Sequence, residues 1–248
     1  MSAVYILVMI LALIGMIVCS KKQKANPAMQ PVGFVLFVVV IISAGLLLKE
    51  MNVFGTSSGP LQSEIRFYVS QGSKTGDYLK SVAPGKKVLL IVENATDQNE
   101  NLKKLADALK ENYGGDVVID APAVEGVEEG TPIYYAMKAK DFDELVEKHA
   151  DAGIVVSTIG LPEDMKNLKF TRLSEDKRPL LFLLGLPNGA FTGLYQAIQN
   201  GVINGVIVPN PKANYEETAP SDPVKAFDMR YVLVTKANAE EYKSSLAI

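Results

Sequence analysis

The sequence predicts an α/β fold in which two N-terminal transmembrane helices precede one doubly wound domain built on a mainly parallel sheet. Three observations support this prediction. Two long uncharged apolar runs lie within the first 50 residues, short continuously apolar segments recur from residue 86 onward, and amphipathic segments alternate with them. Buried strands that alternate with helices are typical of a parallel sheet covered on both faces.

The two apolar runs, Ser2–Cys19 and Pro31–Leu48, predict a transmembrane hairpin over residues 1–50. Each holds about 18 uncharged residues, close to the roughly 20 that a helix needs to cross a bilayer core. A hairpin buried in a soluble core would need a polar face toward water, which neither run offers. A cleaved or lipidated signal peptide fits less well, because no Lys or Arg precedes the first run and Val18 stands where a small residue is required.

The loop between the runs carries Lys21, Lys22 and Lys24 and no acidic residue. Because short basic loops stay in the cytoplasm, we expect both termini and the following domain on the periplasmic or exterior side of the cell (inner) membrane. The lipid bilayer is then one partner. Small residues in the runs allow close helix packing, so other membrane-protein subunits or a second copy of the chain are expected partners as well. These small residues are Gly15, Gly33, Ser43, Ala44 and Gly45.

Residues 51–63 are rich in Gly and Ser and predict a linker, and residues 64–248 predict the α/β domain, with an edge strand expected at 64–70. Further strands are expected at 86–93, 116–120, 152–160, 179–185 and 204–210, and helices at 101–115, 141–149, 194–202 and 238–246. Right-handed crossovers between such elements make a Rossmann-like sandwich the simplest arrangement.

The first of these helices shows the periodicity most clearly, because Leu102, Leu105 and Leu109 share one face. Thr96 or Asp97 is expected to cap its start, and the glycines at 114 and 115 to end it. Three segments predict no regular element. These are the irregular stretch 121–139, the polar stretch 161–178 and the proline-rich loop 209–223.

Charge and composition exclude several functions. Of the 25 basic and 28 acidic residues, residues 1–59 hold four lysines and one glutamate, which leaves the rest of the chain with a net charge of −6. An acidic domain is a poor match for nucleic acid or for an anionic lipid surface. Cys19 is the sole cysteine and His149 the sole histidine, so we expect neither disulfides nor a metal site in the domain, and no cofactor.

Catalysis has little support in the sequence. His149 ends an expected helix, where a favourable interaction with the helix dipole explains it, and no serine lies in a G-x-S-x-G motif. A mechanism that uses carboxylates alone stays open. The carboxylates in question are Asp141, Asp143, Glu144, Glu163 and Asp164.

Ligands of open parallel sheets bind outside the carboxyl ends of the strands, beside helix N-termini. This rule selects polar or small residues suited to a modest polar solute, although each also has a structural explanation as a cap or a turn. They are Glu93, Asn94, Thr96 and Asp97 after the first apolar strand, Ser157 and Thr158 after the third, Gly185, Asn188 and Gly189 after the fourth, and Asn210 after the fifth. The glycine-rich turn 185–193 matches neither phosphate-binding motif, which speaks against nucleotide binding.

Four segments, 86–94, 101–115, 150–160 and 199–210, together resemble one lobe of the type I periplasmic binding proteins. In that family, α/β lobes close around a small solute outside the cytoplasm. This resemblance implies a solute-binding lobe but transfers no individual ligand residue. The part of the chain from residue 60 onward has about 190 residues, too few for two full lobes.

The sequence therefore favours a non-catalytic, membrane-anchored extracytoplasmic domain that acts as a binding or assembly subunit of a membrane complex. The alternative is a solute receptor that serves a transporter or a sensor. A membrane-anchored hydrolase or transferase that uses carboxylates is the third hypothesis.

Overall fold

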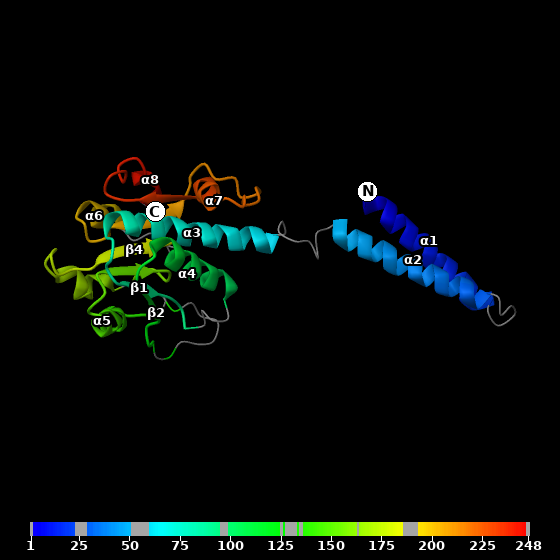
Figure 1. The fold of residues 1–248 in the computed structure, drawn as a ribbon, viewed down its shortest axis with the longest axis horizontal. Helices are drawn as coiled ribbons and strands as arrows, with labels where there is room; N and C mark the ends of the chain where they lie inside the picture. The colour runs from blue at the N-terminus through cyan, green and yellow to red at the C-terminus, as the bar shows by residue number, and fades with distance from the viewer. Residues whose placement is uncertain are drawn as a thin grey trace. The chain divides into compact units, whose positions relative to one another are not determined.

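The structure, a computed structural model, describes residues 2–22, 29–50, 60–94, 99–124, 126, 133, 136–162, 164–185 and 193–246. The chain divides into two compact units, Met1–Gln62 and Ser63–Ile248 (Figure 1).

The first unit contains helices α1 (Ser2–Lys22) and α2 (Met29–Glu50), which pack against each other. Gly15 permits their close approach, because a Cβ atom there would lie 2.9 Å from Cδ1 of Leu36. Gly33 also faces α1, since a Cβ atom added there would lie 3.8 Å from Cβ of Cys19. These two small residues therefore serve the contact within the hairpin.

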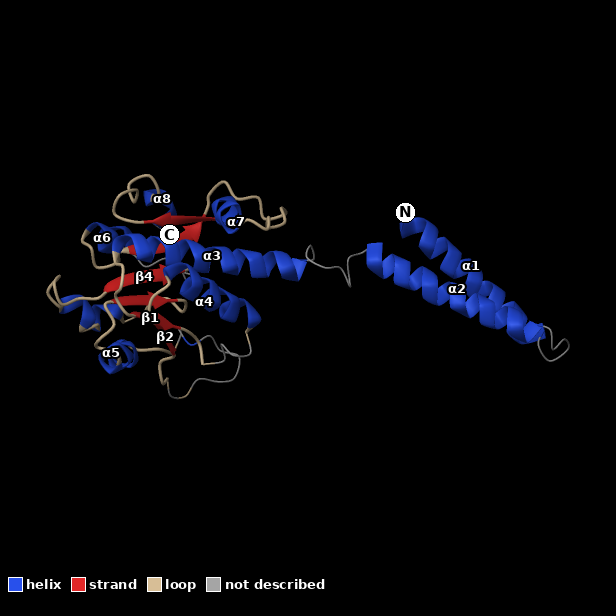
Figure 2. Ribbon diagram, in the orientation of Figure 1, coloured by secondary structure: helices blue, strands red, loops and turns tan. Residues whose placement is uncertain are grey.

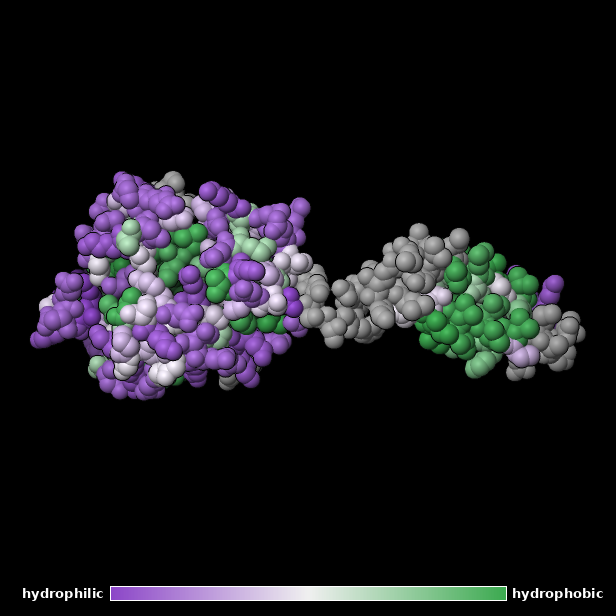
Figure 3. All heavy atoms as spheres, turned by 45° about the horizontal axis from the view of Figure 1, so that its top comes forward, coloured by the Kyte–Doolittle hydropathy of each residue, from purple (hydrophilic) through white to green (hydrophobic). Residues whose placement is uncertain are grey.

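Both apolar runs form helices, as expected, but the prediction that they span a membrane is not supported. Among the helices that the structure describes, none is both long enough and apolar enough to cross a membrane. Large apolar side chains are exposed on both helices, and the hydropathy surface of the hairpin is mostly hydrophobic where it is coloured (Figure 3). The exposed residues include Ile10, Leu11, Ile14 and Ile17 on α1 and Phe34, Val35, Phe37, Ile41 and Ile42 on α2.

A six-stranded sheet forms the centre of the second unit, with the order β2-β1-β3-β4-β5-β6. All neighbouring strands are parallel except β6, which runs antiparallel to β5. The predicted α/β domain with a mainly parallel sheet is therefore confirmed. The strands are β1 (Val88–Ile91), β2 (Val117–Asp120), β3 (Ile154–Ser157), β4 (Leu180–Leu184), β5 (Gly205–Pro209) and β6 (Tyr231–Val234).

Helices cover both faces of this sheet (Figure 2), as a doubly wound fold requires. Alternate residues of each strand point to opposite faces, so Leu89 and Ile91 pack on one side and Val88 and Leu90 on the other. Each fully buried side chain of this size contributes about 1.5–3 kcal/mol. The first face is covered by α5 (Ala139–Lys148), α6 (Leu194–Gln199) and α8 (Lys243–Leu246), and the second by α3 (Pro60–Val82), α4 (Glu100–Tyr113) and α7 (Pro223–Arg230).

The expected edge strand at 64–70 is wrong, because these residues belong to the long helix α3. Two glycines of α3 press against the backbone of α4. A Cβ atom at Gly72 would lie 2.2 Å from the carbonyl oxygen of Leu105, and one at Gly76 would lie 2.8 Å from that of Leu109. The close crossing lets α3 and α4 share one layer over the sheet.

The ends of the helices follow capping chemistry. Asn99 caps α4 by accepting a hydrogen bond from the amide of Leu102, and it lies three residues after Thr96 and two after Asp97, the expected caps. Gly114 ends α4 in the left-handed conformation, with φ of 70°, as expected. His149 is the C-cap of α5, also as expected.

Two other expectations need correction. The stretch 161–178 is not all polar surface, because two short 3₁₀ helices, Met165–Asn167 and Phe170–Arg172, place Leu168 and Phe170 in the core. The last helix, expected over 238–246, is a single turn. Much of the irregular stretch 121–139 lies outside the described residues.

Candidate functional site

The order of the strands reverses at β1, since the chain passes from β1 to β2 on one side and then to β3 on the other. In open sheets of this kind, ligands bind outside the carboxyl ends of the strands near such a reversal. The carboxyl ends of β1, β2 and β3 are therefore the place to look for a site. Glu93 and Asn94 follow β1, and Ser157 and Thr158 lie at the end of β3.

A cleft of about 440 Å³ lies at the carboxyl ends of β1 and β2, beside α4. Its volume falls within the range of small-molecule sites, roughly 300–1,000 Å³. Strand ends contribute the predicted residues Glu93 and Asn94, and α4 contributes Lys103 and Asp107. The remaining lining residues are Val92, Ala106, Ile119, Asp120 and Ala121.

The lining of this cleft carries charges of both signs, namely the ammonium group of Lys103 and the carboxylates of Glu93, Asp107 and Asp120. The carboxylate of Glu93 acts on Tyr68 of α3, whose pKa is raised first by burial and then by the carboxylates of Glu64 and Glu93. An uncharged amide, at Asn94, completes a set of donors and acceptors. The cleft is therefore suited to a solute that has both hydrogen-bond donors and acceptors.

Ser157 and Thr158 do not line this cleft. The hydroxyl of Ser157 is fully buried and donates to the carbonyl of Gly160 at 2.6 Å. The hydroxyl and the amide of Thr158 both donate to the carbonyl of Ile91, at 3.1 and 3.0 Å. Ser157 therefore stabilises the turn after β3, and Thr158 holds this turn against β1, so both have a structural role.

The remaining predicted site residues are not brought to the cleft in the part of the chain that the structure describes. Gly185 forms a turn with φ of 91°, and Asn210 uses its amide to bind the backbone. Four others, Thr96, Asp97, Asn188 and Gly189, lie outside the described residues.

The sequence rule missed Lys103 and Asp107, because it selects residues that follow strands and not those on a flanking helix. A usable signal was present. The two residues are four apart on one side of the expected helix, and Lys103 lies close to its N-terminus. A helix that packs beside the end of β1 would present that edge to the same space.

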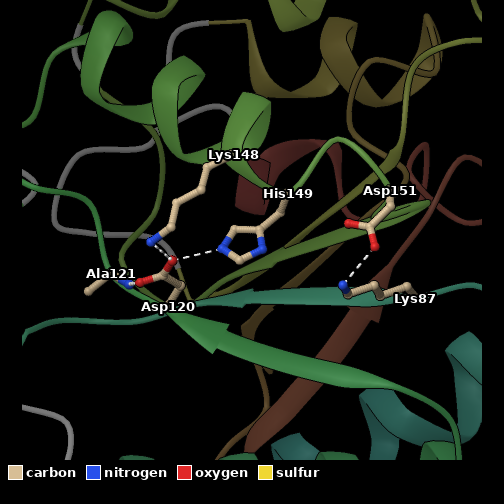
Figure 4. A network of polar contacts seen from close by, with 6 residues as sticks. All are labelled: Lys87, Asp120, Ala121, Lys148, His149 and Asp151. Atoms are coloured by element: carbon tan, nitrogen blue, oxygen red, sulfur yellow. Dashed lines mark hydrogen bonds and ion pairs between the residues drawn. The ribbon is translucent and has the colours of Figure 1, made fainter.

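Asp120 ends β2 at the margin of the cleft and ties it to α5 (Figure 4). Its carboxylate accepts a hydrogen bond from Nζ of Lys148 at 2.7 Å and another from the amide of Ala121 at 2.9 Å. It also contacts Nε2 of His149 at 2.7 Å. Burial raises the pKa of Asp120, but the hydrogen bonds from His149 and Lys148 outweigh burial and lower the pKa from 3.8 to about 2. Asp120 is therefore ionised at neutral pH and structurally occupied.

A second ion pair in the same view joins Nζ of Lys87 to Asp151 at 2.7 Å (Figure 4). It links the start of β1 to the turn before β3, and the hydrogen bond raises the pKa of Lys87 and lowers that of Asp151. Both groups are solvated, so this pair adds little stability.

Of the carboxylates expected as catalytic candidates, Asp141, Asp143, Glu144 and Asp164 have partners in the structure, and Glu163 lies outside the described residues. Asp143 is buried and accepts from the amides of Lys169 and Phe170, at 2.9 and 3.3 Å. Asp141 and Asp164 accept from the amides of Lys138 and Ala139 at the start of α5. Among the described residues, no group of three or more His, Cys, Asp or Glu side chains is placed to hold a metal ion.

Comparison with known proteins gives similarity in structure alone. No family model and no curated protein matches the sequence. Similar solved structures include a carbohydrate transporter from Acidothermus cellulolyticus in complex with myo-inositol (12% identity, TM-score 0.45, 73% of this chain), the glucose-galactose binding protein GanP from Geobacillus stearothermophilus (15%, 0.43, 69%), and a substrate-binding protein of a sugar transport system from Bordetella parapertussis (12%, 0.44, 73%).

The chain spans about three fifths of the length of these structures, at 61%, 61% and 59%. Sugar-binding proteins of transport systems are among these structures, in line with the weak resemblance to one lobe of the type I periplasmic binding proteins.

Proposed function

We propose that the α/β unit binds a small polar solute in the cleft at the carboxyl ends of β1 and β2. The observation that carries this proposal is the lining of the cleft, in which Lys103, Asp107, Asn94 and Glu93 surround a space of about 440 Å³. The solute needs acceptors for the ammonium group of Lys103 and donors for the carboxylate of Asp107. Small polyols, sugars and amino acids have this chemistry.

A binding role suits these residues better than a catalytic one. Asp120, whose pKa is lowered to about 2, is held by Lys148 and His149 and cannot easily accept a proton. A receptor that passes its solute to a transporter or a sensor is consistent with such a site.

The proposal is tested by thermal-shift screening of the full-length protein in detergent against sugars, polyols and amino acids. A solute that binds the folded state raises stability by mass action, by about 2.7 kcal/mol at 100 times its Kd. For a solute that raises the melting temperature, we expect Lys103→Ala and Asn94→Ala each to weaken binding roughly tenfold, since each removes hydrogen bonds to the ligand.

Lys104→Ala is the matched control. Lys104 is the neighbouring lysine on α4, it is exposed, and it does not line the cleft. If Lys103→Ala and Lys104→Ala leave the affinity equally unchanged, the cleft is not the binding site. If no solute of these classes shifts the melting temperature, the proposed function is wrong.

We also propose that the N-terminal hairpin attaches the protein to a membrane and that the α/β unit lies on the extracytoplasmic side. The exposed apolar side chains of α1 and α2 support attachment, and the lysines at 21, 22 and 24 support the orientation. When membranes are extracted with alkaline carbonate, the protein should stay in the membrane pellet. Labelling of Lys22→Cys by an impermeant thiol reagent in intact cells would overturn the orientation, provided that Cys19→Ser is the background.

A further inference from the structure

The outer edge of β6 has an unusual pattern of hydrogen bonds. Among the described strands, β6 ends the sheet and pairs only with β5. The amide of Asn210 donates to the carbonyl of Arg230 at 2.8 Å, which fixes the phase of the antiparallel ladder. With Val208 opposite Val232, the backbone N–H and C=O groups of Tyr231 and Leu233 point away from β5.

The chain itself occupies both ends of this edge. The amide of Tyr231 donates to the carbonyl of Phe227, at the end of α7. At the other end, the side-chain amide of Asn238 donates to the carbonyl of Leu233 at 3.1 Å and accepts from the amide of Thr235 at 2.8 Å. One carboxamide thus bridges the C=O of one residue and the N–H of the second residue after it, as a neighbouring parallel strand would do.

One equivalent pair remains between these two ends. It consists of the C=O of Tyr231 and the N–H of Leu233, which have the same spacing along the strand as the pair that Asn238 bridges. Within the described ranges, no hydrogen bond reaches either group. Both residues are half-buried, so an unmade hydrogen bond here is costly when a ligand excludes water.

This open pair lies in a groove of about 490 Å³, the β6 groove. Aromatic rings of Tyr78, Phe227 and Tyr242 contribute to its walls, together with Lys74 and Asp228. The ammonium group of Lys74 lies 5.4 Å from the centre of the Phe227 ring. The remaining lining residues are Asn210, Tyr231, Val232, Leu233, Thr235, Ala237 and Asn238.

We propose that the β6 groove binds a small molecule that has a primary carboxamide on an apolar body. The carboxamide N–H donates to the carbonyl of Tyr231, and its oxygen accepts from the amide of Leu233. The apolar body packs against the rings of the groove. The contact of Asn238 with the adjoining pair shows that a carboxamide satisfies this spacing.

The geometry distinguishes a carboxamide from other ligands. A carboxylate lacks the donor that the carbonyl of Tyr231 requires, and it would also meet the carboxylate of Asp228. An amine lacks the acceptor that the amide of Leu233 requires. A longer added strand is blocked, because Phe227 and Asn238 already occupy the flanking positions.

The test uses the full-length protein in detergent, labelled with ¹⁵N-leucine, and two probes of similar size. Benzamide has both the donor and the acceptor, and N,N-dimethylbenzamide has only the acceptor. We expect benzamide to shift the amide resonance of Leu233 saturably and to bind roughly tenfold or more tightly than the dimethyl compound. Equal effects of the two probes would overturn the proposal without any substitution in the protein.

Two variants of one residue provide the second arm. Leu233→Pro removes the outward N–H and leaves the ladder to β5 intact, because edge strands tolerate proline at such positions. Leu233→Ala shortens the same side chain and keeps the N–H. We expect Leu233→Pro to abolish benzamide binding and Leu233→Ala to keep it within about threefold. If the two variants bind benzamide alike, the open backbone pair is not the site.

Discussion

At the scale of single residues, Asp120 connects three elements through one carboxylate. It ends β2, binds Lys148 and His149 at the end of α5, and accepts from the amide of the next residue. A carboxylate with three hydrogen bonds is held in its charged form, which is why its pKa falls to about 2 in spite of burial. This charge fixes the margin of the proposed cleft.

The sign of its contribution to stability follows from the lowered pKa. The contribution is fully present above about pH 4 and is lost as the pH falls from 3.8 toward about 2. Asp120→Asn should lower the free energy of unfolding by roughly 1 kcal/mol at pH 7. Urea midpoints measured between pH 7 and pH 2 should show this difference shrinking below pH 4. A difference that is independent of pH would contradict the ion-pair explanation.

Arg230 is a second residue with an effect beyond its own element. Its guanidinium is buried, stacks 3.6 Å from the centre of the Phe67 ring, and pairs with Glu64 at 2.9 Å. Its Nε is the one buried side-chain nitrogen or oxygen of the described residues that lacks a hydrogen bond. The side chain therefore contributes packing as well as its pairing with Glu64, although one of its N–H groups makes no hydrogen bond.

Substitutions at this position separate packing from charge. Arg230→Ala should destabilise the protein by about 3 kcal/mol, because it leaves a void beside Phe67. Arg230→Met should cost less than about 1 kcal/mol, because it fills the space and releases the half-exposed Glu64 to water. Equal losses for the two variants, measured by chemical denaturation, would show that the ion pair dominates.

The candidate site could be predicted in part for reasons that are visible at this scale. Glu93 and Asn94 follow a continuously apolar strand, so the strand-end rule finds them. Ser157 and Thr158 satisfy the same rule, but their hydroxyls have backbone acceptors within reach and turn inward. Only the packed structure distinguishes the two cases. Lys103 comes from a neighbouring helix, whose position beside β1 is a tertiary property.

At the scale of elements, α3 shows why one segment was assigned incorrectly. The segment 64–70 contains Ile, Phe, Tyr and Val, which favour strands, and the buried face of α3 is rich in small polar residues and glycine. The sequence of α3 therefore shows only a weak apolar stripe with the period of a helix. The glycines are needed because the helix crosses close to the backbone of α4, a contact that local sequence does not reveal.

For substitution of these glycines by alanine, helix propensity and the close crossing of α3 and α4 predict opposite changes in stability. Helix propensity alone says that Gly72→Ala should stabilise α3 by about 1 kcal/mol. The close crossing says that it should destabilise the protein by roughly 2 kcal/mol, because the new methyl group would lie 2.2 Å from a backbone oxygen. We expect destabilisation in thermal unfolding. Ser81→Ala, at an exposed position of the same helix, should change stability by less than about 0.5 kcal/mol.

At the scale of the whole molecule, the predictable part of the fold was the alternation of buried strands with helices. Strands β1, β3, β4 and β5 are mostly apolar because both of their faces are covered, and this property is visible in sequence. Strand β6 is an exception, since its direction depends on the turn that α7 makes before it. The α3 layer was missed for the reason given above.

The cover that α3 provides has a consequence for the limits of the folded unit. Phe67 and Leu79 of α3 and Ala83, which directly follows it, are buried, and Leu79 and Ala83 belong to the core on the second face of the sheet. A chain of residues 60–248 keeps this cover, whereas a chain of residues 86–248 exposes the apolar side of β1 and of α4 to water. We expect the longer chain to be monodisperse by size-exclusion chromatography and to unfold cooperatively, and the shorter chain to aggregate, because loss of a core helix removes several kcal/mol from a marginal total. Cooperative unfolding of the chain that begins at residue 86 would mean that the parallel sheet is stable with one layer of helices incomplete.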